Sequence, residues 1–243
     1  MIKTLQELNA KEQFRPTALS LFYNGNYFIK KGIYEGIRRN AHYMRGTLLD
    51  FGCGNKPYES LFKVDQYIGI DMKEVGHDHT NESVDVYYDG KHIPFDDSHF
   101  DCVFSSEVFE HVFNLEEMLR EISRVLKNDG VLLITLPFVW YEHEIPHDFA
   151  RYSSYGIQDL MKRHGFEIVV IEKTSNWPVT IIQLCNSFLY HLVFPKNTIL
   201  KMLLSVLIIF PLNLLGLLLS GSFKGHDELY LNNVVLAKKA GKS

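Results

Sequence analysis

A short glycine-containing loop at 50–55 (DFGCGN) is the first place where residue types and spacing could bind a ligand. Gly52 and Gly54 let the backbone pass close to a bound molecule and adopt a positive φ. The loop follows the apolar run 47–51, which we expect to be a buried strand. Because open α/β sheets bind their ligands beyond the carboxyl ends of their strands, the loop predicts a ligand site there.

Two acidic residues follow the next two apolar runs. Asp71 ends the run 67–71, about 20 residues after the loop, where a carboxylate can accept both hydroxyls of a ribose. Asp89, followed by Gly90, comes directly after the run 84–88. Each has an ordinary explanation when taken alone, since acids cap strand ends and Asp-Gly pairs are common in turns. Taken together and in this order, they predict a nucleotide-like cofactor.

A second group of reactive residues lies at 137–152, after the fifth apolar run, where histidines, acids and aromatic residues are concentrated. His147, beside Asp148, could act as a general base with an orienting partner, and His143 is the second candidate. The alternative is that His147 and Asp148 only brace the loop, with Arg151 paired to an acid. We expect this loop to contact the substrate, because loops at this edge of the sheet commonly do so.

The overall composition is that of an ordinary globular protein. The 243 residues are 46% apolar with a formal net charge of −4, so the charge balance does not favour nucleic acid as a partner. The three cysteines do not form a disulfide framework, and no cysteine or histidine spacing indicates a metal site. Residues 1–15 lack the apolar core of a signal peptide. We therefore expect a cytoplasmic protein without a metal.

Strands and helices are predicted to alternate from position 46 onward. Apolar runs typical of a buried parallel sheet recur at 47–51, 67–71, 84–88, 100–105, 131–136, 166–172 and 229–238. Asn114 is placed to cap a helix, with Glu117 completing a capping box and 128–130 ending it. The pattern predicts an α/β fold, a Rossmann-like, seven-stranded, mostly parallel sheet with helices on both faces.

In this order, the motifs resemble the class I S-adenosylmethionine-dependent methyltransferases, in the small-molecule group called type 11. The segments that carry the resemblance are DFGCG, YIGID, YYDGKHIPFDDSHFDCVFSSEVFEHV and ISRVLKNDGVLLITLP. It covers residues 46–172, and the last strand fits again at 229–238. The segment PHDFARY also resembles one in methyltransferases linked to bacterial cell-surface sugar synthesis. The resemblance implies S-adenosylmethionine as the cofactor and a sugar-like small molecule as the methyl acceptor.

The resemblance implies a role for individual positions as well. Gly52 and Gly54 would run beside the methionine part of the cofactor, and Asp71 would accept both ribose hydroxyls. Asp89 would bind the adenine amino group, with Gly90 near the ring. The other implied cofactor residues are Asp50 in the loop and two residues just past the fourth strand, Ser105 and Glu107, near the methionyl end.

One position departs from the pattern of that family. Where a third glycine often stands, two residues after Gly54, this chain has Lys56, followed by Pro57, which suits the first turn of a short helix. A dehydrogenase is the competing interpretation, but the last glycine of its G-x-G-x-x-G pattern is missing here. The segments 93–95 and 110–112 have no place in the dehydrogenase pattern either, so we prefer the methyltransferase.

A strongly apolar insert lies late in the chain, at 179–221. Its second half, 199–219, is about long enough to span a bilayer, although it carries Lys201 and Asn213. A single crossing would separate the sixth and seventh strands, which are expected in one sheet. Two interpretations stay open: peripheral contact with a membrane, and a lid or homo-oligomer surface, of which the second is slightly favoured.

Three regions are therefore predicted: an N-terminal helical cap at 1–45, a methyltransferase domain at 46–178 and 222–243, and the apolar helical insert at 179–221. The predicted reaction is O-methylation of a sugar or glycan precursor, in which a base removes the hydroxyl proton. The alternatives are a methyltransferase for a lipid-like acceptor such as a quinone, and a non-catalytic cofactor-binding protein. His111, after the fourth strand, is expected to support the site.

Overall fold

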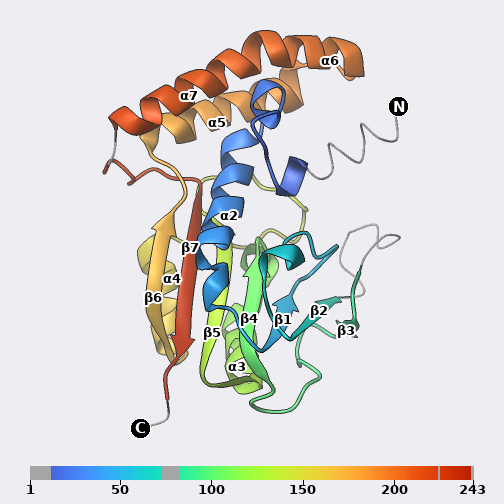
Figure 1. Ribbon diagram of the computed structural model, residues 1–243, viewed down its shortest axis with the longest axis vertical. Coiled ribbons are helices and arrows are strands. Elements are labelled where there is room, and N and C mark those ends of the chain that lie inside the picture. The colour runs from blue at the N-terminus through green and yellow to red at the C-terminus, as the bar shows by residue number, and fades with distance from the viewer. Residues whose placement is uncertain (1–11, 73–82, 224, 242–243) are drawn as a thin grey trace. The chain divides into compact units, whose positions relative to one another are not determined.

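The computed structural model describes residues 12–72, 83–223 and 225–241 and contains the predicted sheet (Figure 1). Its seven strands are hydrogen-bonded in the order β3-β2-β1-β4-β5-β7-β6. The pairs β1–β2, β1–β4, β2–β3 and β4–β5 are parallel, and in Figure 1 the arrow of β7 runs opposite to that of β6. The strands are β1 Thr47–Phe51, β2 Gln66–Met72, β3 Val86–Tyr88, β4 Phe100–Ser106, β5 Leu126–Pro137, β6 Phe166–Lys173 and β7 Asn232–Lys239.

Helices precede the first strand and lie between later strands. The α-helices are α2 Tyr27–Asn40, α3 Leu115–Val125, α4 Ser154–Arg163, α5 Trp177–Phe188, α6 Thr198–Leu204 and α7 Phe210–Ser222. Two π-helical turns, η6 Leu189–Val193 and η7 Ser205–Ile209, continue α5 and join α6 to α7. Short 3-10 turns are η1 Ser20–Phe22, η2 Ala41–Tyr43, η3 Glu59–Leu61 and η5 Phe109–His111. The apolar insert is therefore helical, as predicted.

The largest core lies between the sheet and helices α3 and α4. Apolar side chains recur at every third or fourth position of α3, so Met118 and Ile122 point together into this core and are fully buried. They pack in one cluster with Leu49 and Val103 of the central strands and with Leu160 of α4. A fully buried side chain of this size contributes roughly 1.5–3 kcal/mol, so this cluster fixes the strand ends that carry the candidate site.

Two local predictions around α3 are wrong. The side chain of Asn114 caps no N–H of the first turn; its amide instead donates to Glu117 Oε2 at 3.0 Å and to the carbonyl of Gly90 at 3.3 Å. Residues 128–130 do not end the helix, because α3 stops at Val125 and β5 begins at the next residue. β5 pairs with β4 at Leu126 and again from Val131 onward, so residues 127–130 form a bulge within the strand, where Asp129 has φ 64°.

The chain divides into two compact units that differ from the predicted regions. The sheet unit comprises Gly36–Glu172 and Asn233–Ser243, and the helical unit comprises Met1–Glu35 and Lys173–Asn232. The N-terminal residues up to Glu35 fall in one unit with the insert. Gly36 marks the boundary in α2: a Cβ there would lie 2.5 Å from Val234 Cγ2, so the helix approaches β7 closely at this position.

Candidate active site

The glycine loop after β1 has the backbone conformation that the sequence predicts. Gly52 has φ 74° and Gly54 has φ 46°, both in the left-handed region. A Cβ on Gly52 would lie 2.5 Å from Val108 Cγ2, so no larger residue fits there without a shift. A Cβ on Gly54 would meet no atom of the described residues within 4 Å, which leaves its backbone accessible to a ligand.

Lys56, at the position of the missing third glycine, has a left-handed backbone conformation. Its φ is 50°, a left-handed value that costs a non-glycine residue about 1–2 kcal/mol. Its ammonium group forms an ion pair with Asp85 and lies 5.8 Å from the centre of the Tyr67 ring. A glycine would adopt this conformation without that cost.

The two predicted cofactor acids lie at the carboxyl ends of neighbouring strands. Asp71 connects β2 to the glycine loop, since its Oδ2 accepts from Gly54 N at 2.8 Å and its Oδ1 from Met72 N at 2.8 Å. Asp89 closes a turn after β3, where its Oδ1 accepts from the backbone N–H groups of Lys91 and His92 at 2.9 Å. Those two backbone bonds lower the pKa of Asp89. Both carboxylates are thus placed where a ribose and an adenine could reach them.

The other predicted cofactor residues hold strand ends together. Asp50 is buried and accepts from Tyr67 Oη at 2.6 Å; burial raises its pKa to about 7, opposed by that hydrogen bond. Ser105 Oγ donates to the carbonyl of Phe51 at 2.8 Å. Glu107, at φ 55°, accepts from Thr135 Oγ1 at 2.8 Å. Their contact with a cofactor stays a prediction.

A carboxyl group and two imidazoles converge beyond β4 and β5. One ligand atom from each of Glu110, His111 and His143 lies within 4.8 Å of the others, and we call this set the imidazole cluster. The two imidazole rings meet edge to face, with centroids 4.8 Å apart. His111 Nδ1 lies 2.8 Å from the carbonyl oxygen of His147, which fixes the ring. Such a donor set could hold a divalent transition metal, although the sequence predicted none.

Asp148 pairs with His143, so the predicted His147–Asp148 arrangement is corrected. Asp148 Oδ2 lies 3.1 Å from His143 Nδ1 and accepts from the backbone N–H of His143 at 2.9 Å. Both carboxylate oxygens also accept from the Arg151 guanidinium, at 2.5 and 2.6 Å. The chain turns at Glu144, whose carbonyl accepts from His147 N at 2.9 Å, and the His147 ring lies beside Phe149. This turn brings His143, and not the adjacent residue, to the carboxylate.

The electrostatics of this pair favour a neutral imidazole that can accept a proton. Burial, and then the neighbouring His111, lower the pKa of His143. Burial would raise the pKa of Asp148, but Arg151 and the His143 backbone lower it to about 2. Nδ1 of His143 faces two acceptors, Asp148 Oδ2 at 3.1 Å and the Tyr141 carbonyl at 3.3 Å. Nδ1 therefore carries the hydrogen and Nε2 is the accepting nitrogen.

Glu110 is a functional candidate that sequence reasoning missed. Its side chain is 1% exposed, and among the described residues neither carboxyl oxygen has a hydrogen-bond partner. Burial, and then the charge of Glu107, raise the pKa of Glu110 well above its ordinary value. The available signal was an acid inside the apolar run after β4, but the neighbouring His143 is 33 positions away in the chain, and only the fold brings the two side chains near each other.

Aromatic side chains gather in the same loops. Trp140 and Tyr141 are stacked with ring centroids 4.8 Å apart, and Phe113 and Phe149 meet edge to face at 5.3 Å. Tyr141, Phe113 and Phe149 are exposed. Exposed rings beside polar groups offer flat apolar surfaces to a ligand with both polar and C–H faces.

Comparison with known proteins identifies the class of this domain. Residues 49–134 match the family described as "Methyltransferase domain". Over 65 residues the chain is 43% identical to sarcosine/dimethylglycine N-methyltransferase of Halorhodospira halochloris, covering 27% of this chain and 23% of that protein. Over 120 residues it is 32% identical to an uncharacterized protein of Methanocaldococcus jannaschii, covering 48% and 47%. The chain therefore spans less than half the length of these two relatives.

Solved structures agree on the fold. The [4+2]-cyclase SpnF aligns with a TM-score of 0.54 at 19% identity, over 86% of this chain and 80% of that one. Phosphoethanolamine N-methyltransferase 2 of Haemonchus contortus, in complex with S-adenosyl-L-methionine, aligns with a TM-score of 0.51 at 16% identity, over 94% and 59%. With the family match, these likenesses define the class I methyltransferase fold. Residues 49–134 are the part of the chain that is similar to a methyltransferase domain.

Proposed function

We propose that the protein transfers a methyl group from S-adenosylmethionine to a hydroxyl of a sugar-like acceptor. The observation that carries the proposal is the His143–Asp148–Arg151 arrangement beside the buried Glu110, in loops that follow the central strands. A hydroxyl acceptor, unlike an amine or a stabilised carbanion, gains from a positioned base, and His143 Nε2 is available for that role. The exposed aromatic rings at 113, 141 and 149 support an acceptor with apolar C–H faces.

The chain's own residues fit the cofactor at three points. Gly54 offers an accessible backbone, Asp71 offers a carboxylate at the loop, and Asp89 offers a second one at the end of the neighbouring strand. When bound, S-adenosylmethionine supplies an electrophilic methyl group on a positively charged sulfur. Asp71 would hold the ribose and Asp89 the adenine, so that the methionyl end is directed towards Ser105 and Glu107.

In the proposed reaction, His143 takes the acceptor proton. Bound S-adenosylmethionine would supply the methyl group to the hydroxyl oxygen, and the proton that this hydroxyl loses would move to His143 Nε2. Asp148 keeps the imidazole in the required tautomer and stabilises the imidazolium, while Arg151 holds the carboxylate. The proton then passes to solvent. Alignment of oxygen, methyl and sulfur supplies the rest of the acceleration.

Other acceptors have support of their own. A lipid-like acceptor such as a quinone is favoured by the exposed apolar surface of the helical unit. One relative is named as an N-methyltransferase, so an amine is a further acceptor class. The fold alone does not determine the activity, since one structural neighbour is named as a [4+2]-cyclase. A non-catalytic protein that binds the cofactor is therefore a further alternative.

A product assay tests the proposal. Purified protein would be incubated with S-adenosylmethionine labelled on its methyl group and a panel of nucleotide sugars, glycans, quinones and dimethylglycine. We expect label in a sugar hydroxyl and an equal amount of S-adenosylhomocysteine. Label only in the quinone would establish the lipid-like alternative, and label only in the amine would remove the need for His143 as a base. Addition of a chelator is expected to leave the rate unchanged.

A further inference from the structure

The helical unit has an inverted distribution of polar and apolar side chains. Its buried residues include Gln183, Asn186 and Asn213, each 0% exposed. Its outward residues include Ile199, Leu207 and Leu218, which are 74%, 70% and 66% exposed. A helix on the surface of a water-soluble protein shows the reverse pattern. The exposed surface of this unit is therefore built for an apolar environment.

The buried polar side chains fasten the two long helices to the N-terminal segment. Gln183 Oε1 accepts from Phe28 N at 3.0 Å, and its Nε2 donates to the carbonyl of Gly25 at 2.7 Å. Asn213 accepts from Asn186 at 2.8 Å and donates to the carbonyl of Leu21 at 2.8 Å. These bonds connect the helices to the chain without using their apolar faces, so the apolar faces are left outside.

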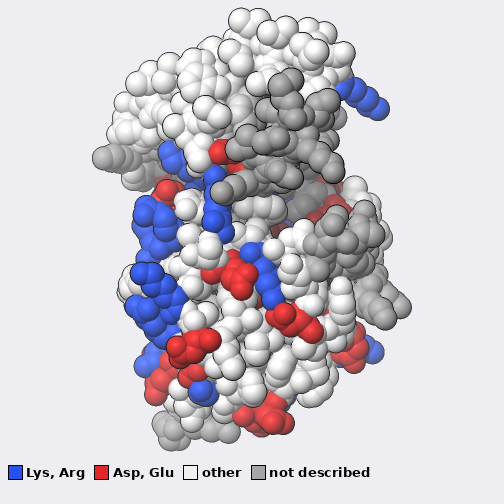
Figure 2. All heavy atoms as spheres, turned by 45° about the vertical axis from the view of Figure 1, so that its right-hand side comes forward, with Lys and Arg blue, Asp and Glu red and all other residues white. Residues whose placement is uncertain are grey.

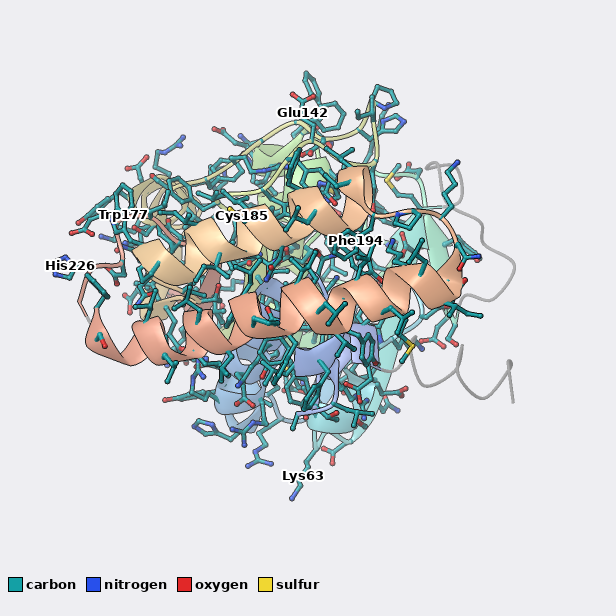
Figure 3. All side chains as sticks on the ribbon, turned by 90° about the horizontal axis from the view of Figure 1, so that it is seen from above. Lys63, Glu142, Trp177, Cys185, Phe194 and His226 are labelled. Atoms are coloured by element: carbon teal, nitrogen blue, oxygen red, sulfur yellow. The ribbon has the colours of Figure 1, made fainter. Side chains whose placement is uncertain are left out.

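The exposed positions of the helix 198–222 are all apolar between residues 199 and 218. These residues are Ile199, Leu200, Met202, Leu203, Val206, Leu207, Ile208, Pro211, Leu214, Leu215 and Leu218. Figure 3 shows this helix and α5 side by side, with Trp177 and His226 at one end of the pair. Protein interfaces carry about one hydrogen bond per 100–200 Å². The exposed side chains at 199–218 are apolar and cannot form such bonds. Lipid chains need none.

The charges of this region also suit a lipid surface. Residues 174–226 contain no Asp or Glu, and their only Lys or Arg residues are Lys196, Lys201 and Lys224. In Figure 2 the helical unit is white over most of its visible surface, with one basic side chain projecting at its edge. Basic residues next to an apolar surface attract anionic headgroups, at about 1 kcal/mol for each.

The buried side of the same helix argues against a transmembrane orientation. Among the described residues, the helix Thr198–Ser222 is the one long and apolar enough to cross a membrane. Its buried residues Ser205, Ile209, Asn213 and Gly216 form a stripe along its length, and a Cβ on Gly216 would lie 2.5 Å from the Phe28 ring. A crossing would take the N-terminal segment that contacts this stripe into hydrocarbon.

We propose that the helical unit docks on the surface of a lipid bilayer containing anionic lipids, with α5 and the helix 198–222 lying in the plane of one leaflet. The outward leucines enter the acyl region, and Lys196 and Lys201 contact the headgroups. This proposal is independent of the acceptor proposed above, because it rests on the surface of the helical unit alone.

Vesicle flotation of the full chain tests the proposal. Wild-type protein is expected to float with vesicles of phosphatidylcholine and phosphatidylglycerol, less so with phosphatidylcholine alone, and less at high salt. The triple variant Ile199→Asp/Leu207→Asp/Leu218→Asp should bind these vesicles about 100-fold more weakly, since each leucine-sized side chain contributes several-fold to about tenfold. Lys196→Glu should lose several-fold on the anionic vesicles only.

Matched controls separate docking from misfolding. Leu207→Asp is compared with Tyr155→Asp on α4, where an 81% exposed aromatic residue of the sheet unit receives the same charge, and the second variant should float like the wild type. Each variant should keep its affinity for S-adenosylmethionine within about twofold. The wild type could instead fail to bind vesicles and form an oligomer, and the triple variant could be monomeric. That result would contradict docking on a bilayer and would show that the apolar surface binds a second copy of the chain. A monomeric wild type that ignores vesicles would overturn the proposal.

Discussion

Two histidines of the 137–152 loop are candidates for one proton-accepting role, and their surroundings separate them. His143 lies 3.1 Å from the Asp148 carboxylate and 4.8 Å, ring to ring, from His111. His147 uses its backbone carbonyl to hold His111 and packs its ring beside Phe149. The sequence places His147 next to Asp148, but adjacent side chains in a turn need not meet. At the residue scale, spacing alone therefore selects the right loop but does not identify the interacting pair.

Substitution of the two histidines tests this assignment. His143→Ala is expected to lower turnover by roughly 10²–10⁴, because the base and its orientation by Asp148 are both lost. His147→Ala should cost less than His143→Ala, since its carbonyl remains to hold His111. Rates are compared at saturating S-adenosylmethionine, and affinity for the cofactor should be unchanged in both variants. If His147→Ala is the more damaging substitution, the roles are exchanged.

The ionisation of His143 gives this prediction a pH dependence. Its pKa is lowered in the folded protein, so the accepting form dominates from a lower pH than for a free histidine. The rate should rise with pH through one group below the ordinary histidine value and then level off. Asp148→Asn should abolish the negative charge beside the imidazole and shift this midpoint lower still. An unchanged midpoint in Asp148→Asn would contradict the pairing.

Glu110 should make stability depend on pH in a direction set by its burial. Its pKa is raised in the folded state, so the stability of the protonated form is fully present below the unfolded pKa and is lost as the pH rises towards the folded pKa. Glu110→Gln should therefore be more stable than the wild type at pH 7.5 by roughly 1–3 kcal/mol, because the amide does not ionise and each pKa unit between the folded and unfolded states is worth about 1.4 kcal/mol. The difference should shrink at pH 4.5. Urea unfolding at both pH values measures it, and equal stability at both would contradict the burial of an unpaired acid.

At the scale of elements, glycines in two helices have opposite surroundings. A Cβ on Gly36 of α2 would lie 2.5 Å from Val234 Cγ2, whereas on Gly156 of α4 its nearest neighbour is Ser153 Oγ at 3.4 Å. Gly36→Ala is expected to destabilise the protein by about 1–3 kcal/mol through overpacking, although alanine favours helix. Gly156→Ala should be neutral or stabilising by up to about 1 kcal/mol. Chemical denaturation of both variants decides, and equal effects would contradict the close packing of α2 on β7.

Sequence periodicity predicted most of the helices and strands. Elements that are buried in the core need apolar residues at regular spacing, and this spacing can be read from the sequence. The run 47–51 became β1 with those bounds, and 166–172 became β6 with one further residue. The failure at 128–130 arises because β5 begins directly after α3 and bulges there, so that Leu126 and Val131 pair with β4. The failure at Asn114 has another cause, since its amide donates to Glu117 and to the carbonyl of Gly90. The pairing of Asp148 with His143, and the burial of Glu110, depend on how loops pack, which periodicity does not describe.

At the scale of the whole molecule, each of the two units combines segments that are far apart in the sequence. The N-terminal residues join the insert because Gln183 and Asn213 satisfy backbone groups near positions 21–28. The helical insert itself was predictable from its composition, but the inward direction of its few polar side chains was not. That direction decides which surface is left for a lipid bilayer. The sheet unit keeps the methyltransferase fold and the predicted order of motifs.

Binding of S-adenosylmethionine tests the central claim most directly. Calorimetric titration of the wild type should show one site. Asp71→Ala should weaken binding by roughly 1.5–3 kcal/mol, because a charge-assisted contact with the ribose is lost. Asp65→Ala, in the exposed segment before β2, is the matched control and should bind like the wild type. Absence of binding by a folded wild type, or equal affinity of Asp71→Ala and wild type, would contradict the assignment of this domain's cofactor site.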